Sequence, residues 1–224
     1  MHPTLTERAN AGLHHQVWQW LQQQPWYQPS LRVLDVGCGT GAWLARFAAE
    51  PQRPAGQGLM GIDMDKGQFK LEGVAHRCLN LDEGPPSHLG QFELVTALEI
   101  IEHLGNPGHL LQLAATHLLP GGHLLLSTPN IHALPARLRF LLTGRLPHFD
   151  AKSDATHIFP MYTDSWQRLV ARYPFTQVEC WSYPARYAAT FGRPMRLLSA
   201  LLSPLLPGTL PGDNLVWLLR RNAV

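Results

Sequence analysis

Short apolar runs alternate with amphipathic stretches along most of this chain. The apolar runs have the length of β-strands and occupy residues 31–36, 58–63, 74–79, 91–98 and 119–128. Amphipathic segments at 42–50 and 107–119 lie between them and have the apolar spacing of helices. Such alternation is typical of a parallel sheet with helices on both faces. The pattern predicts one doubly wound α/β domain over residues 1–224, with a cofactor-binding core at 31–130.

Outside this core, the pattern predicts a leading helix and a more variable C-terminal half. An apolar face recurs along 5–24, where Thr4 or Thr6 is the expected helix cap. Residues 131–174 are predicted to form a substrate lid that includes a helix at 163–173, capped by Thr163. Residues 175–181 and 215–220 are predicted to be the final, antiparallel pair of strands. An insertion at 182–214 separates these strands and contains an apolar, helix-like stretch at 193–207.

The sequence V-L-D-V-G-C-G-T-G at residues 33–41 predicts a glycine-rich turn between a strand and a helix. Such turns bring bare backbone against a nucleotide ligand. Gly37, Gly39 and Ala42 also fit the dinucleotide pattern G-x-G-x-x-A, which leaves an NAD(P)-dependent oxidoreductase as an alternative. Asp35, two residues before the first glycine, would repel a pyrophosphate but attract an ammonium or sulfonium group. S-adenosylmethionine (SAM) carries both groups, so Asp35 favours SAM.

The segment D-V-G-C-G-T-G resembles motif I of the class I SAM-dependent methyltransferases. The resemblance implies SAM as cofactor, S-adenosyl-L-homocysteine as product, and a Rossmann-like seven-stranded sheet of order 3-2-1-4-5-7-6 whose last strand is antiparallel. It implies that Asp35 binds the methionine ammonium and that Met64 lies beside the adenine. Asp63 follows the glycines at about the 20-residue spacing at which an acid reaches the ribose hydroxyls. The expected cofactor-binding residues are Asp35, Gly37, Cys38, Gly39, Gly41, Asp63, Met64, Asn80, Leu81 and Leu98.

Asn80 departs from the family pattern, which usually has an acid here that accepts a hydrogen bond from the adenine amino group. An asparagine side-chain oxygen can accept the same bond without the charge. A shift of one or two residues in the alignment would assign this role to Asp82 instead.

Glu99, Glu102 and His103 have the spacing i, i+3 and i+4, which puts three potential metal ligands on one face of a helical turn. This E-x-x-E-H segment resembles the ubiquinone-pathway O-methyltransferases, in which it is associated with a divalent cation near the acceptor. Two carboxylates and an imidazole suit Mg²⁺, Mn²⁺ or Zn²⁺. The alternative, which we favour, is a turn without metal whose histidine contacts cofactor or substrate. His103 is therefore a candidate catalytic residue.

Three segments of the lid have a recognisable layout: R-F-L-L-T-G-R at 139–145, H-I-F at 157–159 and Y-T-D-S-W at 162–166. The layout resembles the ubiquinone-type, methionine-biosynthesis-type and glycan-modifying methyltransferases. The resemblance implies that His157 faces the acceptor, where an imidazole can act as general base. The alternative is a histidine that bonds to loop backbone and holds the lid shut.

Composition adds only broad expectations about partners and location. The formal charge is +2 and charged residues make up 15%, which does not indicate a nucleic-acid partner. Three scattered cysteines without a C-x-x-C pair indicate reduced thiols in the cytoplasm. We expect neither a signal peptide nor a spanning helix, because no charged leader precedes an apolar run and no run reaches about 18 apolar residues. The stretch 193–207 is expected to contact its own domain, a second subunit of a homodimer, a membrane surface or a lipid-linked acceptor.

The resemblance implies that the acceptor atom is a hydroxyl oxygen. The expected acceptors are a sugar hydroxyl of a glycan or lipid-linked saccharide, and a small phenolic quinone precursor. The E-x-x-E-H segment and the apolar insertion favour the phenol, whereas the lid layout favours the sugar. A regulatory partner protein that keeps the fold without catalysis is a further alternative.

Overall fold

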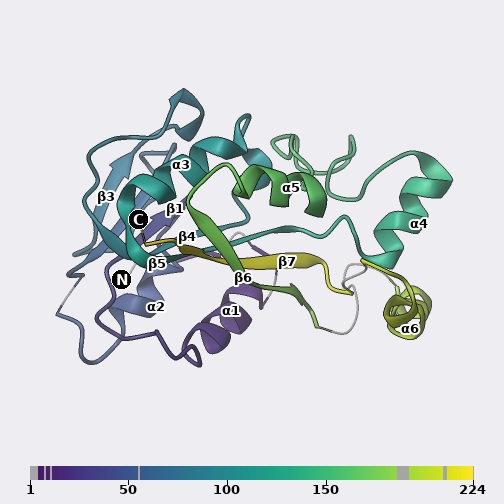
Figure 1. Ribbon diagram of the computed structural model, residues 1–224, viewed down its shortest axis with the longest axis horizontal. Coiled ribbons are helices and arrows are strands. Elements are labelled where there is room, and N and C mark those ends of the chain that lie inside the picture. The colour runs from purple at the N-terminus through teal and green to yellow at the C-terminus, as the bar shows by residue number, and fades with distance from the viewer. Residues whose placement is uncertain are drawn as a thin grey trace.

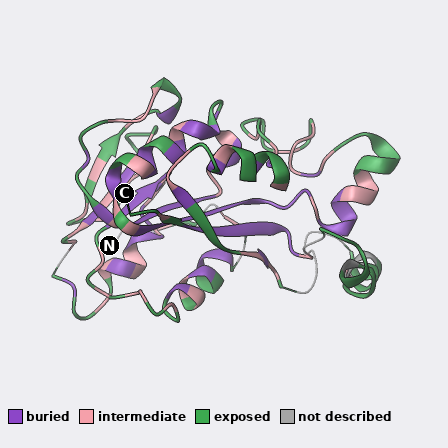
Figure 2. Cartoon of the chain, viewed as in Figure 1, coloured by how far each residue is buried: buried purple, intermediate pink, exposed green. Residues whose placement is uncertain are grey.

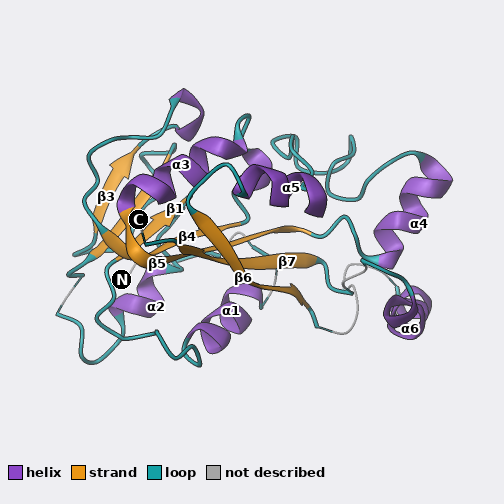
Figure 3. Cartoon of the chain, viewed as in Figure 1, coloured by secondary structure: helices purple, strands orange, loops and turns teal. Residues whose placement is uncertain are grey.

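The computed structural model describes residues 5–7, 9–10, 12–54, 56–185, 192–208 and 211–223. Its centre is a seven-stranded sheet of order β3-β2-β1-β4-β5-β7-β6 (Figure 3). Neighbouring strands from β3 to β5 run parallel, and β7 is antiparallel to both β5 and β6. The prediction of the strand order and of the reversed last strand is confirmed. The strands are β1 (Val33–Val36), β2 (Leu59–Asp63), β3 (Ala75–Cys78), β4 (Phe92–Leu98), β5 (Leu118–Pro129), β6 (Phe175–Tyr183) and β7 (Asn214–Arg221).

Helices cover both faces of the sheet (Figure 1). The helices α1 (Leu13–Leu21) and α2 (Leu44–Ala48) lie on one face, and α3 (Pro107–His117) and α5 (Thr163–Val170) lie on the other. Each face has its own hydrophobic core, and β7 contributes to both by alternation. Trp217 points into the core beneath α3 and α5, whereas Val216 and Leu218 point into the core beneath α1 and α2. A strand that is buried on both faces has to be apolar throughout, which explains the continuous hydrophobic run at 215–219.

The carboxyl ends of the parallel strands share one edge of the sheet, and this edge positions the site. In the sheet register, Asp35 of β1 pairs with Gly61 of β2 and with Thr96 of β4. The 3-10 helices η1 (Leu81–Glu83) and η2 (Ile101–His103) follow β3 and β4 at the same edge. Segments that are far apart in the sequence therefore meet where open α/β sheets bind their ligands.

Two helix caps differ from the sequence prediction. The leading helix is predicted over 5–24, but α1 begins at Leu13, after Gly12 with a φ of 84°. Thr6 is not a cap and donates its backbone N–H to Thr40 Oγ1 at 3.0 Å, while Thr4 lies outside the described residues. The helix α5 begins at Thr163, as predicted, but the Thr163 hydroxyl does not cap the helix. It lies 3.1 Å from His132 Nε2. In each case a contact with a distant segment replaces the local cap.

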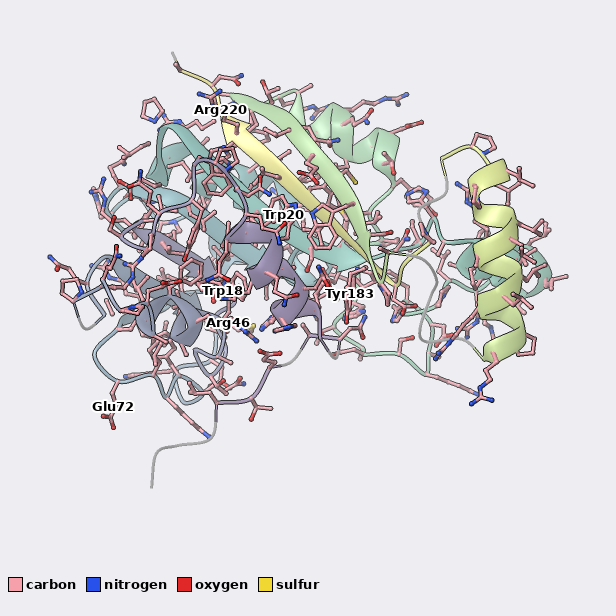
Figure 4. All side chains as sticks on the ribbon, turned by 90° about the horizontal axis from the view of Figure 1, so that it is seen from below. Trp18, Trp20, Arg46, Glu72, Tyr183 and Arg220 are labelled. Atoms are coloured by element: carbon pink, nitrogen blue, oxygen red, sulfur yellow. The ribbon has the colours of Figure 1, made fainter. Side chains whose placement is uncertain are left out.

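The described part of the insertion forms a helical unit at one end of the molecule. It contains α6 (Arg193–Leu202) and the 3-10 helix η3 (Ser203–Leu205), which together span most of the apolar stretch predicted at 193–207. The helix α6 contacts α4 (Leu134–Thr143), and Arg137 of α4 donates hydrogen bonds to the carbonyl oxygens of Pro207 and Gly208. Figures 1 and 4 show this helix pair beyond the sheet and separate from α1. Within the described residues, no helix has both the length and the apolar character needed to cross a bilayer.

Candidate active site

A pocket of about 770 Å³ lies at the carboxyl edge of the sheet. Its wall is formed by the ends of β1, β2 and β4, by residues 79–82 around η1 and by the loop that connects α4 to α5. The N-terminal segment contributes Thr6, Glu7, Ala9, Asn10 and His14. The volume is in the range of pockets that bind small molecules and cofactors. The pocket brings together nine of the ten expected cofactor-binding residues: Asp35, Gly37, Cys38, Gly39, Asp63, Met64, Asn80, Leu81 and Leu98.

The glycine-rich turn forms one side of this pocket. Gly37, Gly39 and Gly41 have φ values of 73°, 50° and 89°, a backbone region that favours glycine. A Cβ at Gly39 would meet no heavy atom within 4 Å, so this backbone faces open space. Gly41 is the exception among the expected residues, because it does not line the pocket and a Cβ there would lie 2.7 Å from Leu71 Cβ. Gly41 therefore permits the turn to pack on its own domain.

Asp35 lines the pocket but is only 3% exposed. Its Oδ1 accepts a hydrogen bond from Thr96 Oγ1 at 2.6 Å, and Trp43 Nε1 donates to the same hydroxyl at 3.2 Å. Burial raises the pKa of Asp35 to about 7, and the nearby charge of Asp63 adds to this effect while the Thr96 bond opposes it. Thr96 is not among the predicted site residues, although a lone hydroxyl in the apolar run at 91–98 is a signal for it.

Asp63 and Asn80 organise backbone as well as lining the pocket. Asp63 Oδ2 accepts from the Gly39 N–H at 2.8 Å, and its Oδ1 accepts from the Asp65 N–H at 2.9 Å. Asn80 Oδ1 accepts from the Asp82 N–H at 3.1 Å, while Asp82 itself accepts from the Gly105 N–H at 2.9 Å. Each of these oxygens retains a further lone pair for a ligand.

Met64 and Leu81 give this part of the pocket an apolar lining. The Met64 side chain is 72% exposed, whereas Leu81 is buried. Cys78 Sγ donates to the Met64 carbonyl at 3.2 Å and ties the end of β3 to the residue after β2. The exposed Met64 side chain offers apolar surface that can pack on a flat ring.

His103 and His157 line another part of the pocket and form a cluster with Glu102, which does not itself line the pocket. One carboxylate oxygen and one nitrogen of each imidazole lie within 4.8 Å of one another, and the two rings are 4.6 Å apart at 78°. Glu102 is completely buried, and neither of its carboxylate oxygens has a hydrogen-bond partner among the described residues. Burial raises the pKa of Glu102 well above its usual value, and the charge of Glu99 adds to this.

Hydrogen bonds determine the tautomer of both histidines in this cluster. The Thr156 hydroxyl donates to Asp154 Oδ1 at 2.6 Å, so it accepts at 2.8 Å from the Nδ1–H of His103. The carbonyl oxygen of His148 can only accept, so at 2.9 Å it takes the Nδ1–H of His157. Both Nε2 atoms consequently carry lone pairs in the neutral rings. His157 thus bonds to loop backbone, as one of its two predicted roles requires, and still lines the pocket with a nitrogen that is able to accept a proton.

The structure does not assemble the predicted metal triad of Glu99, Glu102 and His103. Glu99 precedes η2 and has a φ of 57°, so the helical spacing rule does not apply to it. Its carboxylate accepts from Ser127 Oγ at 2.7 Å and from Asn214 Nδ2 at 2.6 Å. His157 takes the place of Glu99 beside Glu102 and His103. A set of one carboxylate and two imidazoles, each imidazole held through its other nitrogen, is a donor set that fits a transition-metal ion.

Glu99 is part of a hydrogen-bond chain that the sequence did not indicate. Asn214, the first residue of β7, donates to Glu99 and accepts from Asn10 Nδ2 at 2.6 Å. Glu99 and Asn10 both line the pocket. These hydrogen bonds connect the N-terminal segment to β5. Asn10 and Asn214 are more than 200 positions apart in the sequence, a distance at which local patterns carry no signal.

Comparisons with known proteins agree with this architecture. Residues 7–180 match a family described as a methyltransferase domain. A ubiquinone biosynthesis O-methyltransferase of Marinobacter nauticus is 31% identical over 150 residues, which cover 62% of this chain and 57% of that relative. The chain spans about half the length of the curated relatives that it matches.

Two solved structures have the same fold. A SAM-dependent methyltransferase from Archaeoglobus fulgidus has a TM-score of 0.60 and 17% identity, over 93% of each chain. The N-methyltransferase NodS from Bradyrhizobium japonicum, in complex with S-adenosyl-L-homocysteine, has a TM-score of 0.55 and 16% identity, over 94% of this chain and 86% of NodS.

Because the family match covers more than half of its length, the chain belongs to the methyltransferase domain family. With the sheet order of this fold and the glycine-rich turn at 37–41, it has the fold of the class I SAM-dependent methyltransferases, which the resemblance of its motif I implied. The Marinobacter nauticus relative is named an O-methyltransferase, while NodS is named an N-methyltransferase. These names therefore do not define one acceptor atom for this fold.

Proposed function

We propose that the enzyme binds SAM in the pocket at the carboxyl edge of the sheet and methylates a hydroxyl oxygen. The acceptor oxygen attacks the methyl carbon in line with the departing sulfur, and S-adenosyl-L-homocysteine leaves with the electron pair of the broken bond. The hydroxyl proton passes to a base. Because the methyl group of SAM is already activated, the main task of the protein is positioning, which is worth up to roughly 7–11 kcal/mol.

Charge supports the assignment of the cofactor side of the pocket. In our proposal Asp35 binds the methionine ammonium, Asp63 the ribose hydroxyls, and Met64, Asn80 and Leu81 the adenine. Burial holds the pKa of Asp35 near 7, so a cationic group beside it gains by restoring the charge of the carboxylate. This gain is specific to a cationic ligand.

The same geometry argues against an NAD(P)-dependent oxidoreductase. A pyrophosphate on a glycine-rich turn is bound by the backbone N–H groups at the start of the helix. Here the Gly39 N–H already donates to Asp63 at 2.8 Å, and α2 begins at Leu44, after the turn. Two carboxylates, of Asp35 and Asp63, would also face the phosphates. A phosphate group would have to displace one of them.

We assign the role of general base to His157. The observation that supports it is the hydrogen bond from its Nδ1 to the His148 carbonyl oxygen, which leaves Nε2 unprotonated. A general base of this kind contributes about 10²–10⁴-fold to a reaction rate. The ring of His103 lies 4.6 Å from the ring of His157. In our proposal His103 orients His157 and lines the acceptor side of the pocket.

The unpartnered carboxylate of Glu102 favours a second role for the same cluster. Glu102, His103 and His157 would hold a divalent cation, which would lower the pKa of an acceptor hydroxyl bound to it. The two roles exclude each other at His157, because one nitrogen lone pair cannot both bind a cation and accept a proton. Turnover that survives removal of divalent cations assigns the base, and turnover that requires Mg²⁺ or Mn²⁺ assigns the cation.

Two acceptor classes remain in our proposal. The name of the Marinobacter nauticus relative points to a small phenolic acceptor, and the lid layout at 139–166 points to the hydroxyl of a glycan or lipid-linked saccharide. Both are hydroxyl acceptors, and both need a base or a cation beside the oxygen. The distinction between them falls to experiment.

Incubation with methyl-labelled SAM and separate glycan, lipid and small-molecule fractions tests the proposal. We expect label in one fraction, in a linkage that resists mild alkali as an ether does and a methyl ester does not. The variant Asp35→Ala, which weakens SAM binding, serves as the control for enzyme-dependent labelling. Absence of label from all fractions, for a protein that binds SAM in calorimetry, would instead support a non-catalytic partner protein.

A further inference from the structure

The helices α4 and α6 together expose a large apolar surface. The most exposed large apolar residues there are Phe140 (49%), Leu141 (79%) and Leu142 (80%) on α4, and Leu197 (64%), Leu201 (63%) and Leu205 (76%) on α6 and η3. We call these six residues the α4–α6 surface. On α6 and η3 the three leucines recur every four residues, so they form one stripe. Figure 2 shows that α4 is buried at its start and exposed at its far end, and that the described part of α6 is mostly exposed.

The α4–α6 surface lies among basic residues and lacks acidic ones. Residues 131–149 and 192–208 contain five arginines and neither aspartate nor glutamate. One of the five, Arg139, pairs with Asp150, and another, Arg137, donates to the carbonyl oxygens that end the α6 segment. Arg145 and Arg193 are exposed at the edges of the surface. Exposed leucine and phenylalanine next to arginine is the composition of helices that lie in the interface of an anionic membrane.

This charge pattern distinguishes between a membrane and a second copy of the chain. A twofold dimer through the α4–α6 surface would bring the same arginines of two chains close to each other, and like charges across an interface are unfavourable. Anionic lipid headgroups would instead attract these arginines while the acyl chains take up the leucines. The ten residues of α6 span about half of the hydrocarbon thickness, which suits a helix that lies in the plane of the membrane.

We propose that the α4–α6 surface docks the enzyme on anionic membrane surfaces, with the leucines inserted at the boundary between headgroups and acyl chains. The loop that leads from α4 to α5 carries His148 and His157, so docking presents the acceptor side of the pocket to the membrane. This orientation rests on the proposed function, whereas the docking does not. Vesicle binding requires neither cofactor nor acceptor, so failure of the docking and failure of methyl transfer are distinguishable.

Flotation of the full chain with phosphatidylcholine vesicles, with and without phosphatidylglycerol, tests this proposal. We expect wild type to float with the anionic vesicles and to bind neutral vesicles more weakly. Leu197→Ser/Leu201→Ser should lower the partition coefficient about tenfold or more for each leucine that inserts. Arg145→Gln/Arg193→Gln should lower it about fivefold for each charge, and only for anionic vesicles.

A matched control is Val178→Ser on β6, which removes a similarly exposed apolar side chain outside the surface (53% exposed) and should leave flotation unchanged. SAM binding by calorimetry verifies that each variant is folded. Wild type that stays unbound to anionic vesicles overturns the proposal, as does equal flotation of the leucine variant. A wild-type dimer that becomes monomeric in Leu197→Ser/Leu201→Ser would also overturn it, because the surface would then be a subunit interface.

Discussion

Gly37→Ala and Gly39→Ala add the same methyl group to the glycine-rich turn, but the methyl group meets a side chain at position 37 and open space at position 39. Both backbones have positive φ, at 73° and 50°, so both variants bear the cost of a left-handed residue, about 1–2 kcal/mol. At position 37 the new Cβ would lie 1.9 Å from Ile100 Cδ1 and 2.4 Å from its Cγ1. Ile100 would have to move, and overpacking of this kind typically costs about 1–3 kcal/mol. We therefore expect Gly37→Ala to lose about 2–5 kcal/mol of unfolding free energy and Gly39→Ala only about 1–2 kcal/mol.

Cofactor affinity should show the opposite ranking. A Cβ at Gly39 meets no protein atom within 4 Å and projects into the space where we place SAM, so it should weaken SAM binding while it leaves the fold nearly intact. Urea denaturation of the free protein and calorimetric titration with SAM measure the two effects separately. The background Ile100→Ala isolates the contact, because it removes both clashing carbons and should reduce the cost of Gly37→Ala to that of Gly39→Ala. Equal destabilisation by the two glycine variants, or no relief in the Ile100→Ala background, would refute this reasoning.

Three further predictions concern the site. The pKa of Asp35 is about 7 in the folded protein and lies above its unfolded value. The free protein should therefore lose up to about 4 kcal/mol of unfolding free energy as pH rises from about 4 to 7. Urea denaturation across this range should show a smaller loss for Asp35→Asn than for wild type. SAM affinity should rise over the same interval in wild type alone, because the ammonium binds the ionised carboxylate. His157→Ala should lower turnover about 10²–10⁴-fold with an unchanged SAM dissociation constant, and added imidazole should restore part of the rate. Mn²⁺ affinity, measured by electron paramagnetic resonance, should fall about tenfold or more in Glu102→Gln and stay constant in Glu99→Gln, because only Glu102 lies with the two histidines.

Each of these predictions has a result that contradicts it. A pH dependence of stability that is identical in Asp35→Asn and wild type would show that other groups account for all of it, such as Glu99, whose pKa desolvation raises to about 7. Full turnover of His157→Ala with a verified acceptor would end the base assignment. Equal loss of Mn²⁺ affinity in the two glutamate variants would favour the triad predicted from helical spacing.

The strands and the glycine-rich turn could be predicted from the sequence because hydrophobic runs and glycine spacing are local signals. A run of apolar residues that ends in Asp35 and three alternate glycines specifies strand, turn and helix within a dozen positions. Asp63 ends the next strand, and parallel strands end at one edge, so the pairing of these two acids in one pocket follows from topology. The helical spacing of Glu99 to His103 failed for a local reason as well, since the backbone at Glu99 is left-handed and only 101–103 is helical.

The sequence by itself therefore determined the strands of the parallel core and the glycine-rich turn, because hydrophobic periodicity and glycine spacing act over short distances. The strand order followed from the resemblance of motif I to the class I SAM-dependent methyltransferases. Only the tertiary structure decided that His157 joins Glu102 and His103, that Asn10 reaches Glu99 through Asn214, and that α6 packs on α4 beyond the sheet. These contacts join residues dozens to hundreds of positions apart. Their partners are selected by burial, shape and charge once the chain has folded, and no local pattern encodes that choice.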